Sequence, residues 1–160
     1  MAEIPLEIQE QLDTLAAKRY NGLRKRLARP KLVDLGTIPH SLKDIQEVYC
    51  EAYKNGFVCE YCKRQLVFKS IFPYWEAASL DHKRPLMKGG SGEKTNLAVC
   101  CHRCNVIKGT LDAEEYLWVL ESLKLRGAPE LMEKVLSDWF NFWVAMKQDR
   151  EEFEKRGDKI

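Results

Sequence analysis

Hydrophobic positions recur at helical spacing in the first part of the chain and predict two helices there. The first stripe of apolar side chains covers residues 5–28. The second begins after Ser41, a side chain that suits a helix cap, and continues to about Lys54, with Gly56 as a plausible stop. Residues 30–40 between the two helices contain two prolines and a glycine, so we expect a linker there.

From Phe57 onward the spacing changes, and short strand-like runs replace the helical stripes. These runs cover residues 57–58, 65–68 and 77–80, and a glycine-containing loop follows the last of them. Residues 101–108 then predict a short helix that Gly109 ends. The pattern therefore indicates an α+β fold, mostly α overall, with a small mixed centre flanked by N-terminal and C-terminal helices.

Helical spacing returns in the last part of the chain. Thr110 is a suitable cap for a helix over residues 111–125, and Pro129 opens a long helical pattern over residues 129–155. The last helix carries more aromatic side chains than one stripe can hold, which indicates burial on several sides or a partner surface, including a possible homodimer. We accordingly divide the chain into three regions: 1–55, 56–110 and 111–160.

Charge changes this picture, because it is distributed unevenly. The whole chain has a net charge of only +2, which by itself argues against a nucleic-acid partner. Residues 56–110, however, hold nine basic and four acidic side chains, whereas residues 111–160 hold eight and twelve. Residues 18–31 also carry seven basic side chains and no acidic one. This basic block suits a phosphate backbone, and it equally suits a solvated helix face that complements the helix dipole.

The chain has no apolar run near the roughly 20 residues that a membrane-spanning helix needs. Its first residues are acidic and lack the apolar core of a secretory signal. We therefore expect an intracellular, cytoplasmic protein that is not secreted and has no membrane partner. In a reducing compartment, spaced pairs among the six cysteines indicate metal binding more than disulfides.

Four of the cysteines form two C-x-x-C pairs, Cys59 with Cys62 and Cys101 with Cys104, and 38 residues separate the pairs. Two such turns can bring four thiolates to one tetrahedral ion, so we predict a structural Zn²⁺ site. Cys100 is a rival for the place of Cys101, although the tighter spacing favours Cys101. A closed four-thiolate site stabilises the fold and leaves no open position for catalysis. Of the other side chains, we expect Cys50 to lie in the core and His102 to be exposed.

Between and after the cysteine pairs the chain reads Asp81-His82, then Asn96-Leu97, then Cys104-Asn105 with Lys108 three residues on. In this order and spacing the residues resemble the HNH endonuclease family in its zinc-braced form. The resemblance covers about residues 57–109. It implies a ββα-metal fold, in which two strands and a helix surround one catalytic divalent cation.

The resemblance also implies a role for each matching residue. His82 would be the general base that deprotonates the attacking water, and Asp81 and Asn105 would be ligands of a catalytic Mg²⁺ or Mn²⁺. Asn96 would tie the connection between the strands. Many members have histidine where this chain has Asn105. The implied reaction is hydrolysis of a DNA phosphodiester bond that leaves a 5′-phosphate and a 3′-hydroxyl.

Several basic side chains would hold the nucleic acid, both around this motif and in the basic block: Lys83, Arg84, Lys88, Arg103, Lys108, Arg24, Lys25 and Arg26. The alternative function is a non-catalytic, zinc-dependent DNA-binding module with the same cysteines and basic surface. The joint presence of Asp81, His82, Asn96 and Asn105 favours the nuclease, because a binding module does not need all four.

Overall fold

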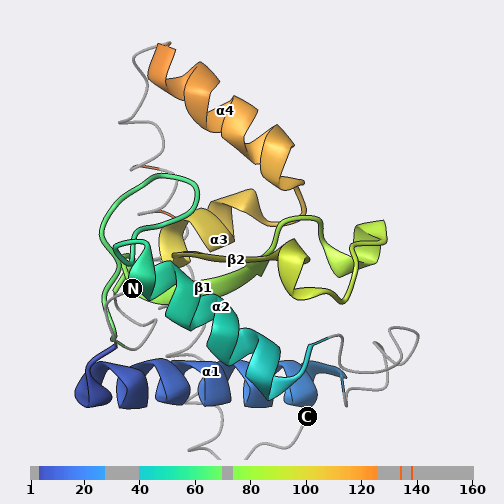
Figure 1. Ribbon diagram of the computed structural model, residues 1–160. Coiled ribbons are helices and arrows are strands. Elements are labelled where there is room, and N and C mark those ends of the chain that lie inside the picture. The colour runs from blue at the N-terminus through green and yellow to red at the C-terminus, as the bar shows by residue number, and fades with distance from the viewer. Residues whose placement is uncertain (1–3, 28–39, 70–73, 126–133, 135–137, 139–160) are drawn as a thin grey trace, which may run out of the picture. The chain divides into compact units, whose positions relative to one another are not determined.

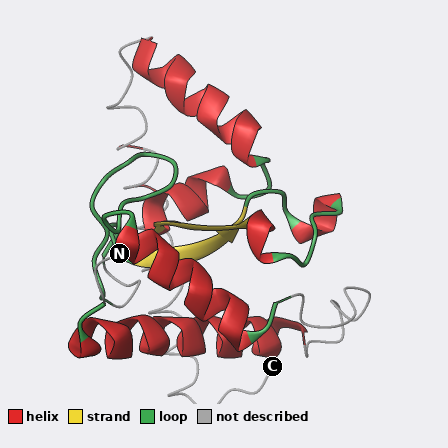
Figure 2. Ribbon diagram, in the orientation of Figure 1, coloured by secondary structure: helices red, strands yellow, loops and turns green. Residues whose placement is uncertain are grey.

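The computed structural model describes residues 4–27, 40–69 and 74–125, together with Lys134 and Asp138. Contacts divide the chain into two compact units, residues 1–117 and 118–160. Helices dominate the described residues, and one small sheet lies among them (Figure 2). The α+β class with mostly helical content is therefore confirmed, while the division into three regions stays a prediction.

The first two helices form as the apolar spacing predicts. α1 spans Leu6–Leu27 and α2 spans Leu42–Lys54, and the two pack against each other (Figure 1). A capping box starts α2, because Ser41 Oγ accepts the Asp44 N–H at 3.0 Å and the Asp44 carboxylate accepts the Ser41 N–H at 2.9 Å. Apolar side chains from both helices are buried between the elements: Leu12, Leu15, Ala16, Ile45 and Tyr49.

The sheet is an antiparallel hairpin of two strands, β1 (Ala78–His82) and β2 (Leu97–Cys101). Its register pairs Asp81 with Ala98 and His82 with Leu97. The run predicted over 77–80 is therefore longer than expected, because pairing with β2 keeps Asp81 and His82 inside the strand. β2 is buried at all five positions, which explains why its sequence lacks the alternation of a half-exposed strand.

The helix α3 (His102–Lys108) follows β2 directly and packs on both strands. It ends at Gly109, whose φ of +51° is in a region that favours glycine, so this predicted helix and its stop are confirmed. In the loop between the strands are two single turns of 3₁₀ helix, η2 (Leu86–Lys88) and η3 (Lys94–Asn96). The order strand, loop, strand, helix is the ββα arrangement that the resemblance implies.

The strand-like runs before the hairpin form only isolated bridges. Val58 pairs with Gln65 in an antiparallel bridge, and Val67 pairs with Ala77 in a parallel one. The backbone between Val58 and Gln65 turns too tightly for a continuous strand, since it carries the first cysteine pair. The segment 58–65 forms a tight turn that lies against the hairpin, where the Glu60 N–H donates to the Val99 carbonyl at 3.0 Å.

The helix after Gly109 starts later than predicted. α4 spans Ala113–Leu125, so Thr110 is not its cap. The backbone N–H of Asp112 instead donates to the Glu115 carboxylate at 2.7 Å, and the Asp112 carbonyl accepts the Tyr116 N–H at 2.9 Å. The predicted helix over 129–155 lies outside the described residues, except for Lys134 and Asp138, which are helical. Within the described part of the chain, no helix has both the length and the apolar character to cross a membrane.

One arginine joins the N-terminal helices to the hairpin. The Arg19 guanidinium on α1 donates to Ser79 Oγ at 3.1 Å and to the Ala78 carbonyl at 3.4 Å. α2 also packs against β2. The ββα unit is therefore covered on one side by helices that precede it by many residues in the sequence, while α3 packs on the strands in Figure 1.

Candidate active site and metal centre

The sulfur atoms of Cys59, Cys62, Cys101 and Cys104 form one cluster, in which all four lie within 4.8 Å of one another. Cys62 Sγ lies 3.8 Å from Cys101 Sγ. Zn–S bonds of about 2.3 Å in a tetrahedral site place the sulfurs about 3.8 Å apart, so the donor set and its spacing fit zinc. The cluster predicted from the two C-x-x-C pairs is therefore confirmed as a group of residues that can hold Zn²⁺.

Local backbone contacts bring each pair to the cluster. In the first pair, the Cys59 N–H donates to the Arg64 carbonyl at 2.8 Å, and Lys63 adopts a left-handed φ of +60° to close the turn. In the second pair, Cys101 caps α3, and its Sγ accepts the Cys104 N–H at 3.4 Å. Hydrogen bonds with Cys101 and Cys104 lower the pKa of the Cys59 thiol to about 6, whereas contacts within the same cluster raise the pKa values of the Cys101 and Cys104 thiols.

The remaining cysteines do not belong to this cluster. Cys100 is fully buried in β2, and burial raises the pKa of its thiol well above the ordinary value, as suits a small core side chain. This outcome confirms Cys101 over Cys100 as the zinc ligand candidate. Cys50 is only half-buried and lies 3.6 Å from Gln9 Nε2, so its predicted place in the core is wrong.

His102 is not the exposed side chain that we expected. Its ring stacks on Trp75 with centroids 5.4 Å apart and an interplanar angle of 15°. The stack forms because the backbone N–H of His102 donates to the Ala77 carbonyl at 3.0 Å and that of Arg103 donates to the Trp75 carbonyl at 3.1 Å. Burial, with a smaller effect from Arg19, lowers the pKa of His102 to about 4, so the ring is neutral near pH 7.

Asp81 lies in a buried polar cluster at the end of β1. Its Oδ2 accepts the Tyr61 hydroxyl at 2.6 Å and the Lys108 ammonium at 2.9 Å. Lys108 also donates to the His82 carbonyl at 2.8 Å, and its side chain is 0% exposed. The sequence analysis assigned Lys108 to the surface as a contact for phosphate, and this buried position shows that the assignment is wrong. The Lys108 ammonium neutralises the Asp81 carboxylate from inside the fold, which a lysine so deeply buried requires.

Asn105 projects from α3 toward the same strand. Its Nδ2 donates to Ser79 Oγ at 2.5 Å and to the Leu80 carbonyl at 3.2 Å. The hydrogen bonds of Asn105 thus fall on its nitrogen, and those of Asp81 fall on Oδ2. The Oδ1 atom of each residue can therefore act as a metal ligand. A carboxylate oxygen and an amide oxygen are ligands that Mg²⁺ and Mn²⁺ accept. The donor chemistry fits a hard divalent cation.

Asn96 holds the loop that follows His82. Its Oδ1 accepts the Arg84 N–H at 2.8 Å, and its Nδ2 donates to the carbonyls of Arg84 and Ser91 at 3.0 and 2.9 Å. Gly90 lies against the same carbonyl, because a Cβ at this position would come within 2.0 Å of Arg84 O. The side chain of Asn96 and the absence of one at Gly90 therefore fix the loop in one conformation.

His82 is the last residue of β1, and its ring contacts a residue that sequence reasoning did not single out. His40 Nε2 lies 2.8 Å from His82 Nε2, with ring centroids 4.9 Å apart and tilted by 32°. His40 is 2% exposed and directly precedes the capping box of α2. The sequence pattern places it at the end of the predicted linker over residues 30–40. The available signal was small: it is one of only three histidines in the chain, and it stands next to a helix cap.

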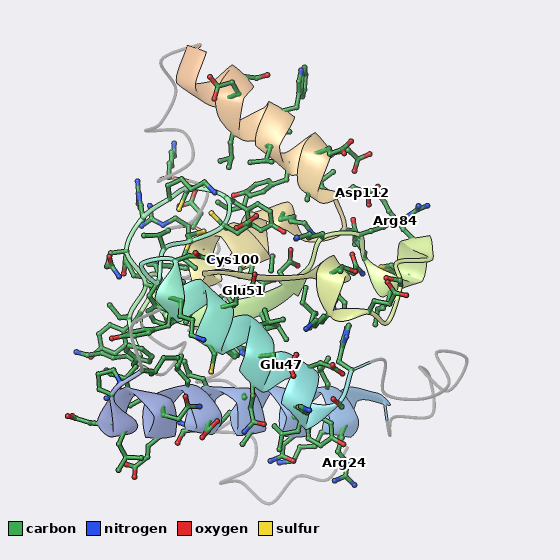
Figure 3. All side chains as sticks on the ribbon, viewed as in Figure 1. Arg24, Glu47, Glu51, Arg84, Cys100 and Asp112 are labelled. Carbon is green, nitrogen blue, oxygen red and sulfur yellow. The ribbon has the colours of Figure 1, made fainter. Side chains whose placement is uncertain are left out.

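The basic side chains expected to hold nucleic acid differ widely in exposure. Arg84 is exposed on the loop after β1, and Arg24 lies on the last turns of α1 (Figure 3). Lys25 is exposed on α1 as well, and Lys83 is half-buried. Lys88 forms ion pairs with Glu115 at 3.0 Å and Asp112 at 3.7 Å.

The two remaining members of the predicted basic set are Arg103 and Arg26. The Arg103 side chain is 11% exposed and lies 3.9 Å from the Glu76 carboxylate, so little of it is on the surface. The side chain of Arg26 lies outside the described part of the chain. Of the predicted set, Arg84 and Lys88 are the exposed cations on the loop between the two strands.

Comparison with known families agrees with this architecture. The family described as HNH endonuclease matches residues 59–111, which span both cysteine pairs, the hairpin and α3. This region of the chain therefore carries an HNH domain, and the resemblance read from its motifs is confirmed. Such a domain indicates a nuclease or a nucleic-acid-binding role. A search of curated proteins finds no match.

Proposed function

We propose that the protein is an endonuclease that hydrolyses phosphodiester bonds in DNA with Mg²⁺ or Mn²⁺ as its catalytic cation. The proposal is supported by two features of a ββα unit whose four cysteines can hold zinc: Asp81 and His82 end β1, and Asn105 of α3 donates to the Leu80 carbonyl of the same strand. Asp81 and Asn105 would hold the cation through their two Oδ1 atoms. A divalent cation held there would supply the positive charge that stabilises the phosphate and the leaving oxygen in the transition state.

His82 is the base in this reaction. A neutral imidazole takes a proton from water, which attacks the phosphorus in line with the 3′ oxygen. The bond to that oxygen breaks, the departing oxygen takes a proton from solvent, and the products carry a 5′-phosphate and a 3′-hydroxyl. Lys108 contributes from inside the fold, since its ammonium contacts both the Asp81 carboxylate and the His82 carbonyl and so keeps the two neighbouring residues in register.

DNA is the proposed partner, and the exposed cations are the proposed contacts. Arg84 is the second residue after β1, and hydrogen bonds with the Asn96 side chain fix its backbone. Its guanidinium would meet the phosphate next to the scissile one. Lys88 would exchange its ion pairs with Glu115 and Asp112 for phosphate. The exposed Arg24 and Lys25 on α1 would add a salt-dependent contact farther along the duplex.

A plasmid assay tests the proposal. Wild-type protein and the His82→Ala variant are incubated with supercoiled plasmid in Mg²⁺ or Mn²⁺, and zinc content is measured for both. General base catalysis contributes about 10²- to 10⁴-fold, so the variant should lose at least about 100-fold in cutting rate. Lys43→Ala, an exposed site on α2, is the matched control and should cut at the wild-type rate. Equal cutting by wild type and His82→Ala, with zinc intact in both, would refute the nuclease.

The same samples distinguish the non-catalytic DNA-binding module. DNA binding is followed by fluorescence anisotropy at several salt concentrations, and cut ends are tested for a 5′-phosphate by direct religation. Salt-dependent binding without cleavage in any divalent ion would assign the domain to binding alone. The possible homodimer is tested separately by light scattering, where a monomer at all concentrations would exclude it.

A further inference from the structure

We propose that His40 is a positioning residue for His82, which fixes the orientation and the tautomer of the His82 ring through the Nε2–Nε2 hydrogen bond. The inference rests on the proposed function, in which His82 takes a proton from water. It adds to the site a residue from outside the hairpin and α3, since His40 precedes His82 by 42 positions. It also lies outside the region 59–111 that matches the HNH family.

The short distance between the two Nε2 atoms determines which nitrogen of each ring carries a proton. At 2.8 Å, one Nε2 donates and the other accepts. A neutral imidazole carries its proton on only one nitrogen, so the ring that accepts through Nε2 must carry its proton on Nδ1. The two neutral rings are therefore opposite tautomers. Without a partner, the second side-chain torsion of a histidine is broad and roughly two-fold, so the contact also selects one ring orientation.

His40 is itself held firmly enough to act in this way. It directly precedes Ser41, whose capping box with Asp44 fixes the first turn of α2. The next turn is anchored by Ile45 and Tyr49, which are both fully buried. The His40 ring is 2% exposed, so water does not compete for its Nε2. A buried ring on a capped helix therefore presents one nitrogen to His82 in a fixed place.

The charge state of His40 is compatible with this role. Burial lowers the pKa of its imidazole, and the opposing effects of the Asp44 carboxylate and the Gly92 backbone are smaller. A neutral ring can either donate or accept through Nε2, whereas a charged ring can only donate. Since His40 engages His82 Nε2, only His82 Nδ1 is left to take the proton from water. His82 therefore carries its proton on Nε2 and donates it to Nε2 of a neutral His40.

Two substitutions separate positioning from simple filling of space. His40→Phe keeps a planar ring and removes the hydrogen bond, whereas His40→Gln places an amide near the position of Nε2. A general base is worth about 10²- to 10⁴-fold, and its misplacement should cost about 10- to 100-fold in kcat of His40→Phe, with KM nearly unchanged. His40→Gln should recover most of that loss. Zinc content and thermal unfolding are measured for each variant to verify the fold.

The hydrogen bond itself is tested by NMR on the ¹⁵N-labelled wild-type protein near pH 8. With only three histidines in the chain, ring spectra are readily assigned from single substitutions. We expect opposite tautomers for His40 and His82 and a scalar coupling between their Nε2 nuclei across the hydrogen bond. Identical tautomers without this coupling would overturn the proposal, as would a kcat for a folded His40→Phe variant equal to that of wild type. The NMR result does not need activity, so it stands even where wild type fails to cut DNA and the nuclease proposal itself fails.

Discussion

Replacing Lys108 by methionine should destabilise the protein more than any exposed lysine substitution can. The lysine side chain is 0% exposed and the Asp81 side chain is 9% exposed, so methionine would leave a buried carboxylate with only the Tyr61 hydroxyl as its donor. Breaking a buried ion pair by removing one partner typically costs about 3–5 kcal/mol. We therefore expect the free energy of unfolding to fall by about 3–5 kcal/mol, close to the low end because Tyr61 still contacts Asp81.

Urea unfolding of zinc-loaded protein, followed by circular dichroism, measures this loss. Lys43→Met is the matched control, because the Lys43 side chain is 83% exposed and should change stability by no more than about 0.5 kcal/mol. In the double variant Asp81→Asn/Lys108→Met both charges are gone, so its loss should be smaller than the sum of the two single losses. A loss below about 1 kcal/mol for Lys108→Met would show that the ammonium is not buried against Asp81, and the internal role assigned to it would be wrong.

Three other expectations follow from the zinc cluster, the loop and the histidine pair. Removing zinc with a strong chelator, or replacing Cys62 by serine, should lower the melting temperature sharply and abolish the one-to-one zinc content measured by mass spectrometry, because metal binding contributes directly to folding. Gly90→Ala should cost about 1–3 kcal/mol in urea unfolding, since its Cβ would meet Arg84 O at 2.0 Å; an unchanged midpoint would contradict the rigid loop. The pKa of His40 lies below its ordinary value of 6.5 in the fold, so the unfolded chain binds more protons and stability should decline as pH falls below about 6.5. His40→Gln should show a smaller decline between pH 8 and pH 5.5, and equal declines in variant and wild type would contradict the buried neutral ring.

The features that sequence could predict are those set by neighbouring residues. Ser41 and Asp44 lie three positions apart and form the capping box, so the start of α2 is readable locally. Each C-x-x-C pair likewise encodes its own turn, and the match of two pairs to one tetrahedral ion needs no knowledge of the rest of the fold. The stop at Gly109 follows from a backbone angle that few other residues adopt.

The features that sequence could not predict depend on side chains brought together from distant positions. Lys108 looked like a surface cation because lysine is almost never buried without a partner, and its partner Asp81 is 27 residues away. His40 stood in an apparent linker, and only the packing of α2 brings it to His82. The sequence pattern did not predict β2 for a different reason. This strand is buried on both faces, so its five residues lack the alternation of apolar and polar side chains that indicates a half-exposed strand.

The tie between Arg19 and the hairpin has a consequence for how this domain can be moved between proteins. The family match covers residues 59–111. The Arg19 guanidinium that contacts Ser79 and the His40 imidazole that contacts His82 both come from earlier in the chain. A chimera that carried only the matched segment would keep its cysteines and lose both contacts, and it would expose the face of β2 that α2 covers. The smallest transplantable unit therefore begins before Arg19, at the start of α1, and an excised segment 59–111 would be a zinc-binding fragment with an unsupported base.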